Sequence, residues 1–118
     1  GVMLANVFFE HNIIELSTKN RDGFHIFLSE IIATFGLIFI IFATLKDGKT
    51  TVAACVATYI SAGYWFTSST SFANPAVAIA RTFTDSFTGI NYLNTPTYII
   101  AELLGTIVAV FIINRLLK

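Results

Sequence analysis

Residues 67–96, TSSTSFANPAVAIARTFTDSFTGINYLNTP, separate two apolar stretches and decide how the rest of the chain is interpreted. Thr67–Ser71 is an uncharged run of hydroxyl side chains, and the following residues up to Ala80 are apolar except for Asn74. A loop outside a membrane would be more polar than this. Asn74-Pro75 is typical of a helix start, because asparagine caps helices well and proline at the first helical position loses no needed N–H.

The helix that begins there is expected to be short. From Pro75 to Phe83 it would measure about 13 Å, roughly half the hydrocarbon thickness of a membrane. A short helix between apolar stretches is typical of a re-entrant segment, whose non-helical backbone must line a cavity or be buried in protein. An Asn-Pro-Ala tripeptide also occurs by chance, and the alternative is an ordinary capped helix. Its position after one expected span and before another favours the re-entrant segment.

The composition of the chain also favours a membrane protein. Of the 118 residues, 55% are hydrophobic and 12% are charged, whereas a soluble domain usually has about 25% charged residues. The seven basic and seven acidic side chains cancel, which excludes disorder, a coiled coil and a nucleic-acid binder with a basic face. Cys55 is the single cysteine, so neither an intrachain disulfide nor a cysteine metal site is expected.

Three apolar stretches around the re-entrant segment are expected to cross the membrane. Residues 27–45 carry one charge, Glu30, and as a helix they cover about 28 Å. The other two stretches, 51–66 and 97–114, each carry a stripe of small side chains at intervals of four residues, which favours close packing of helices. The stripes are Ala53, Ala57 and Ser61 in one stretch, and Ala101, Gly105 and Ala109 in the other.

These patterns predict an all-α membrane protein with three transmembrane helices and one re-entrant half-helix, in a single membrane domain over 1–118. The expected segments are the end of a preceding helix at 1–9, a connection at 10–23, helices at 24–46 and 50–67, the re-entrant segment and its loop at 68–96, and a helix at 97–116.

The basic residues favour a cytoplasmic C-terminus by four against three. On the expected cytoplasmic side are Lys46, Lys49, Arg115 and Lys118, and on the other side are Lys19, Arg21 and Arg81.

On these features the chain resembles the aquaporin (major intrinsic protein) family. The resemblance rests on Asn74-Pro75-Ala76, on the hydroxyl run Thr67–Ser71, on Glu30 in FLSEIIATFG, and on the order of the spans around the half-helix. It implies one repeat of the aquaporin-like inverted-repeat bundle, which corresponds to the second half of a six-span channel. The alternative is an unrelated three-helix membrane protein.

The resemblance implies roles for the Asn-Pro-Ala motif. Asn74 would offer its side-chain NH₂ group to a passing solute, Pro75 would preset the first helical turn, and Ala76 would leave room where two half-helices meet. The N-terminus of such a half-helix carries about half of a positive elementary charge and repels cations and protons.

The selectivity filter implied by the resemblance consists of Ala62, Ser71 and Val77. Val77 follows the motif directly, where the family has an arginine, and all three side chains are small and uncharged. A wide, weakly polar constriction is therefore expected. Arg81, one turn beyond Val77, is a candidate for a positive charge at the outer mouth. The alternatives are an ion pair with Asp85 and a position at the membrane interface.

Glu30 and Glu102 are ionisable residues within expected spans, where such residues usually face the protein interior and mark functional sites. The resemblance implies that Glu30 braces the loop that enters the half-helix. The alternative is a glutamate that reaches water at the membrane interface. Glu102 matches no pore residue of the family and is expected to contact a neighbouring helix or loop.

The expected function is a passive membrane channel for water and small uncharged solutes, such as glycerol and other polyols or neutral metalloid hydroxides. An enzyme is disfavoured, and no cofactor is expected, because the sequence has no nucleophile–base set and no metal-ligand spacing. One alternative is a coupled transporter with a broken helix, although only hydroxyl groups and Arg81 lie near Asn74 in the sequence. Another is a half-channel that transports nothing without a second half.

The expected partners are the lipid bilayer and a second half of the channel, either a missing N-terminal half or a second copy of the chain. The start at Gly1-Val2-Met3 favours a piece of a longer protein, and assembly from half-size chains is the alternative. The resemblance implies a homotetramer, and the expected location is the cell (plasma) membrane. No nucleic-acid partner is expected.

Overall fold

The computed structural model describes residues 1–116, and all of its regular structure is helical. The elements are α1 (Val2–Phe8), α2 (Phe24–Thr44), the 3₁₀ turn η1 (Leu45–Asp47), α3 (Lys49–Phe66), α4 (Pro75–Ala80), the 3₁₀ turn η2 (Arg81–Phe83) and α5 (Thr95–Leu116). The predicted all-α class is therefore confirmed. Lys118, one of the basic residues that favoured a cytoplasmic C-terminus, lies outside the described residues.

Within residues 1–116, two helices are long and apolar enough to cross a membrane. They are α2 together with η1, over Phe24–Asp47, and α5. The helix α3 is not one of them: it begins with Lys49 and two threonines, and many of its other residues are small or carry hydroxyl groups. Of the three predicted transmembrane helices, two are therefore long and apolar enough in the structure. A membrane crossing by α3 stays a prediction.

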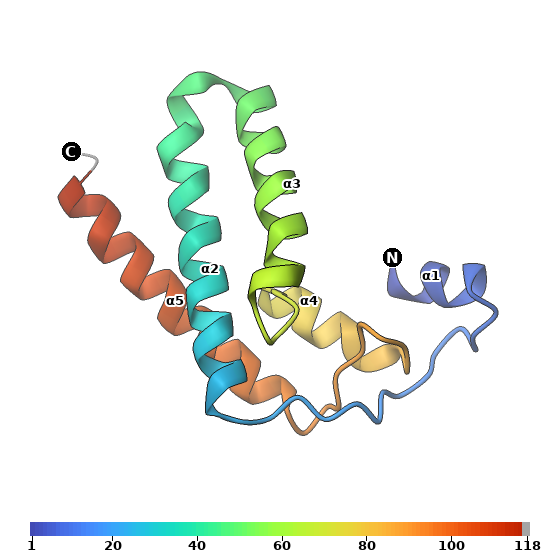
Figure 1. Cartoon of the computed structure of the whole chain (residues 1–118). Coiled ribbons are helices and arrows are strands. Elements are labelled where there is room, and N and C mark those ends of the chain that lie inside the picture. The colour runs from blue at the N-terminus through green and yellow to red at the C-terminus, as the bar shows by residue number, and fades with distance from the viewer. Residues whose placement is uncertain (117–118) are drawn as a thin grey trace.

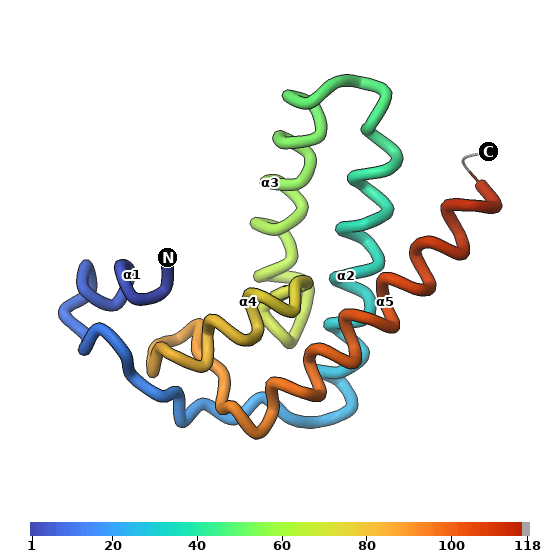
Figure 2. The backbone as a smooth tube through the Cα atoms, turned by 180° about the vertical axis from the view of Figure 1, so that it is seen from behind, coloured from blue at the N-terminus to red at the C-terminus, as the bar shows by residue number. Residues whose placement is uncertain are grey.

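The long helices are arranged around α2. Figure 1 shows α2 and α3 as an antiparallel pair joined by a tight connection, with α5 crossing α2 on its other side. The contact of α2 with α5 is the most extensive in the molecule, followed by its contact with α3. From behind, Figure 2 shows the short α4 beside the end of α3, while α1 lies away from α2, α3 and α5 and contacts η2.

Small side chains allow α5 to approach α2 closely. Ala101, Gly105 and Ala109 of α5 are all buried, which confirms the predicted packing role of this stripe. A Cβ atom on Gly105 would lie 2.5 Å from the main-chain oxygen of Ile31 in α2. Only glycine, which has no side chain, lets the two helix backbones come this close.

The small stripe on α3 behaves differently, because Ala53, Ala57 and Ser61 are all exposed. No helix within residues 1–116 covers this stripe, so its packing role stays a prediction. Instead, α3 contacts α2 through Tyr59, whose hydroxyl donates to the main-chain oxygen of Ala33 at 3.0 Å. This hydroxyl occupies the space that a Cβ atom on Gly36 would need, so the tyrosine decides which face of α3 meets α2.

The connection between α1 and α2 runs beside the loop that follows α4. Two N–H groups of the connection donate to this segment, from Glu15 to the oxygen of Phe83 at 3.3 Å and from Ser17 to the oxygen of Thr82 at 3.0 Å. Further along, the N–H of Asn91 donates to the oxygen of Lys19 at 2.8 Å. These bonds fix the C-terminal end of the half-helix region against a distant part of the chain.

Arg21 completes this attachment from a buried position. Its Nε atom donates to the oxygen of Gly89 at 2.7 Å and its Nη2 atom to the oxygen of Phe87 at 2.6 Å. A buried guanidinium that binds main-chain oxygens holds a loop in place without needing a carboxylate partner.

Candidate functional site: the loop that enters α4

The candidate site is the loop between α3 and α4, whose backbone is unusual. Thr70, Ser71 and Ala73 have left-handed conformations, with φ angles of 66°, 52° and 51°. Left-handed residues other than glycine cost of order 1 kcal/mol or more each, and they persist only where the surroundings fix them. Groups outside the loop must therefore hold it in this shape.

Glu30 of α2 supplies two of these fixed points. Its two carboxyl oxygens accept hydrogen bonds from the main-chain N–H groups of Phe72 and Ala73, both at 2.9 Å. The side chain is 0% exposed, so the alternative that Glu30 reaches water at the membrane interface is wrong. The predicted bracing role of Glu30 remains a proposal, which these two bonds support.

Glu102 of α5 supplies the next fixed point. Its Oε1 atom accepts a hydrogen bond from the main-chain N–H of Asn74 at 3.0 Å, and the side chain is 1% exposed. The expectation that Glu102 contacts a helix or loop is confirmed by this bond. Two carboxyl groups on different helices thus hold three consecutive N–H groups, those of residues 72, 73 and 74.

Hydroxyl groups of the run at 67–71 complete the loop. The N–H of Ser71 donates to the Oγ atom of Ser69 at 3.2 Å, and the hydroxyl of Tyr98 donates to the main-chain oxygen of Ser69 at 3.0 Å. The hydroxyl groups of Ser68 and Ser29 lie 2.9 Å apart. The hydroxyl groups of this run therefore serve contacts with α2 and within the loop, while α5 binds the run through a main-chain oxygen.

Asn74 caps the half-helix, as the sequence predicts. Its Oδ1 atom accepts a hydrogen bond from the N–H of Ala76 at 2.8 Å, and Pro75 is the first helical residue. The residue is exposed. Because Oδ1 serves the cap and Nδ2 has no partner among residues 1–116, the NH₂ group is left free to donate to another molecule.

The three predicted filter residues differ in burial and in their neighbours. Ser71 is buried against the end of α3, where a Cβ atom on Gly63 would lie 2.5 Å from its Oγ atom. Ala62, the neighbour of Gly63, is exposed. Val77 of α4 is half-buried, lines a cavity and packs against the buried cluster that contains Phe72, the residue after Ser71. A filter formed by these three residues stays a prediction.

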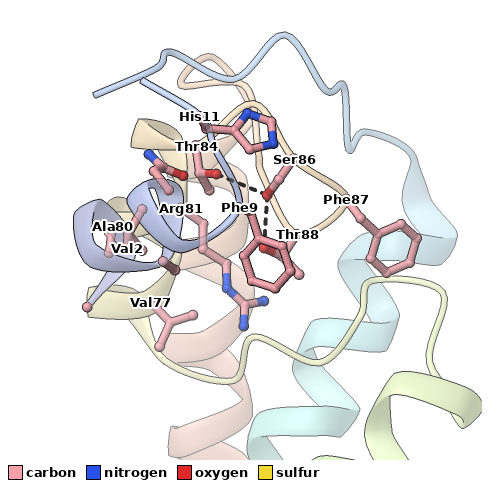
Figure 3. Close-up of a pocket in the computed structure, with 13 residues that line it drawn as sticks. Val2, Phe9, His11, Val77, Ala80, Arg81, Thr84, Ser86, Phe87 and Thr88 are labelled. Atoms are coloured by element: carbon pink, nitrogen blue, oxygen red, sulfur yellow. Dashed lines mark hydrogen bonds between the residues drawn. The ribbon is translucent and has the colours of Figure 1, made fainter. Parts of the chain in front are cut away.

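That cavity has a volume of about 600 Å³ and lies between α1 and the region that follows α4. Figure 3 shows Val77 and Arg81 among its lining residues, together with Ser86, whose hydroxyl is hydrogen bonded to neighbouring threonine hydroxyls. Most of the remaining lining is apolar. The cavity wall is therefore mostly apolar, and its polar part includes the Arg81 guanidinium and a few hydroxyl groups.

Arg81 is held at this cavity by aromatic side chains. Its Nη2 atom donates to the hydroxyl of Tyr64 at 2.9 Å, and its guanidinium carbon lies 4.4 Å from the ring centre of Phe72, a cation–π distance. Its Nη1 atom is buried without a hydrogen-bond partner among the described residues.

The alternative of an ion pair between Arg81 and Asp85 is wrong. The carboxylate of Asp85 instead accepts hydrogen bonds from the N–H and hydroxyl groups of Thr18, at 2.8 and 3.0 Å. The helix ends at Ala80, so residues 81 and 85 do not share the helix face that the prediction assumed.

Comparison with known proteins finds a curated relative of the whole chain. No protein-family model and no solved structure matches the chain. Among curated proteins, the chain is similar to Aquaglyceroporin AqpS of Rhizobium meliloti (strain 1021), with 45% identity over 118 residues. The match covers 100% of this chain and 51% of the relative, so the chain spans about half the length of that protein.

Over its whole length the chain is therefore similar to part of a protein of the aquaporin family. Together with the two long apolar helices, this similarity indicates an integral membrane protein.

Proposed function

We propose that the chain forms half of the pore of a passive channel for water and small uncharged solutes, with glycerol and other polyols as the main solute class. The observation that carries the proposal is the free NH₂ group of Asn74, presented at the start of a short helix whose approach is fixed by buried carboxyl groups. The name of the relative, an aquaglyceroporin, supports polyols as solutes.

In this proposal, Asn74 donates hydrogen bonds to the oxygen of a passing solute. The donor is fixed because the Oδ1 atom is engaged with Ala76, which leaves the amide one orientation. Pro75 and Ala76 give the helix its first turn, and the positive end of the half-helix disfavours cations and protons. The mechanism contains no chemical step and needs no cofactor.

Selection by width depends on the filter residues Ala62, Ser71 and Val77. All three are small and uncharged, so the constriction admits polyols and neutral metalloid hydroxides as well as water. Arg81, fixed by Tyr64 and by the ring of Phe72, would supply a cation at the outer mouth.

We also propose that the chain is one repeat of an inverted-repeat bundle, with α1 as the end of a preceding helix and α3 as a membrane span between α2 and α5. The exposed stripe of Ala53, Ala57 and Ser61 supports a second half that packs against α3, because small side chains in a membrane favour helix contacts. That half would come from the same polypeptide or from a second copy. A homotetramer in the plasma membrane with a cytoplasmic C-terminus completes the proposal.

The test is solute flux through the full-length protein in liposomes. Vesicle shrinkage is recorded after mixing with an impermeant osmolyte, with glycerol and with a neutral metalloid acid. Glycerol flux well above that of empty vesicles, without dependence on a proton or sodium gradient, is the expected result. Water flux alone would contradict the wide filter, and dependence on a gradient would favour a coupled transporter.

A further inference from the structure

We propose that Glu102 is a positioning residue of the pore, which orients Asn74 by accepting the hydrogen bond of its main-chain N–H group. The inference rests on the proposed function and adds to it a residue on α5, a helix that carries none of the predicted motif or filter residues. Glu30 does not perform this role, because its two oxygens are engaged by Phe72 and Ala73.

The geometry shows why the direction of Asn74 needs its own support. Ala73 is left-handed with φ of 51°, whereas Asn74 is extended with φ of −161° and ψ of 119°. The backbone thus changes from a left-handed to an extended conformation between two adjacent residues, directly at the residue that carries the amide side chain. The Asn74 N–H belongs to the peptide bond between Ala73 and Asn74. Its hydrogen bond to Glu102, at 3.0 Å, fixes the plane of that peptide.

The face of α5 that carries Glu102 binds the loop at two places. Tyr98 and Glu102 are four residues apart on one helix face. The tyrosine hydroxyl donates to the oxygen of Ser69 at 3.0 Å, while the carboxyl group accepts from the N–H of Asn74. One rigid surface therefore holds both the beginning and the end of the left-handed stretch.

The burial of Glu102 argues against a role in packing alone. The side chain is 1% exposed, and its Oε2 atom has no hydrogen-bond partner among the described residues. A buried polar atom without a partner costs free energy, which an apolar side chain of similar size would avoid. The bond to Asn74 is the contact that an apolar side chain cannot make.

The experiment compares Glu102→Ala, Glu102→Gln and the control Thr106→Val in the full-length protein in liposomes, with flux expressed per folded channel. Thr106 is a suitable control because it lies one turn further along α5 and, among residues 1–116, its hydroxyl binds only the main-chain oxygen of Glu102, at 2.9 Å. Glycerol and water fluxes are measured for each variant, since a misdirected Asn74 changes their ratio.

We expect Glu102→Ala to lower glycerol flux roughly tenfold and water flux less, since the Asn74 N–H is then left without its acceptor. Glu102→Gln retains an oxygen for the Asn74 N–H, so its fluxes should stay within about twofold of the wild type. Unchanged fluxes in Glu102→Ala would overturn the proposal. Equal loss of both fluxes, or a glutamine variant as impaired as the alanine variant, would overturn it as well.

Amide hydrogen exchange over residues 72–76 separates this inference from the proposed function. If the wild-type protein conducts no glycerol, the proposed function fails. Amide hydrogen exchange still reports on the hydrogen bond between the Asn74 N–H and Glu102 in that case. The Asn74 amide should exchange at least roughly tenfold faster in Glu102→Ala than in the wild type, and remain protected in Glu102→Gln. Equal protection in all three proteins would contradict the role of Glu102.

Discussion

Gly105 of α5 lies directly against the main-chain oxygen of Ile31 of α2, at a distance that leaves no space for a side chain. Ile31 follows Glu30 in the sequence, and Gly105 is one turn from Glu102. The closest approach of the two helices is therefore also the place where the two carboxyl groups come together beneath the loop. The following predictions start from this arrangement.

Replacement of Gly105 by alanine should destabilise the protein. The added Cβ atom would meet the oxygen of Ile31 at 2.5 Å, so the helices must separate, at a cost of about 1–3 kcal/mol. Thermal unfolding of the purified protein in detergent measures the loss. Val108→Ala, at an exposed position of the same helix, should change stability by less than about 0.5 kcal/mol. Equal unfolding temperatures for Gly105→Ala and the wild type would show that the close crossing is unimportant.

Removal of the Glu30 carboxyl group should affect both stability and transport. In Glu30→Ala, the N–H groups of Phe72 and Ala73 lose their acceptors, at a cost of about 1–3 kcal/mol for each group left without a partner. Glu30→Gln retains one acceptor and should lose about half as much stability. Unfolding temperatures and glycerol fluxes of both variants test whether Glu30→Gln lies between the wild type and Glu30→Ala. A glutamine variant less stable than the alanine variant would contradict the bracing role.

Replacement of Val77 by arginine should narrow the filter and reduce glycerol flux more than water flux. A large, charged side chain at this position favours the smaller solute, and we expect the ratio of glycerol to water flux to fall roughly tenfold or more. Val77→Ile, which adds one methylene group, is the matched control and should change the ratio much less. If Val77→Arg reduced both fluxes equally, the wide filter would have no support.

The contact between Asp85 and Thr18 should make stability depend on pH. Hydrogen bonds from Thr18, first of all from its main-chain N–H, lower the pKa of the Asp85 carboxyl below its usual value of 3.8. The carboxylate therefore stabilises the folded state above that value, and this contribution is lost as the pH falls through the lowered pKa.

The variant Asp85→Asn tests this dependence, because it keeps the shape but cannot ionise. The wild type should unfold at a higher temperature than Asp85→Asn at about pH 7, and the difference should shrink below about pH 3. A difference that is independent of pH would show that the charge of Asp85 contributes nothing.

The sequence predicts those features that depend on local chemistry. The cap at Asn74 and the helix start at Pro75 follow from residue types at two adjacent positions, and the structure has both. The small stripe of α5 is buried as predicted, since a long apolar helix has to pack somewhere.

Features that depend on the relative placement of helices were not predictable in this way. The stripe on α3 is exposed because Tyr59 and Gly36, far apart in the sequence, determine which face of α3 meets α2. The partner of Glu102 could not be identified, since the bond to Asn74 exists only where α5 crosses α2. The failed ion pair of Arg81 and Asp85 has a simpler cause, because the helix ends at Ala80 before both residues.

The left-handed residues of the loop have a consequence for the order of assembly during biogenesis. None of Thr70, Ser71 and Ala73 favours its conformation by itself, and the acceptors that hold the neighbouring N–H groups belong to α2 and α5. We therefore expect the loop to remain without fixed shape in the nascent chain until α5 has inserted and docked on α2. Synthesis of α5 would then be the event that gives the loop its shape.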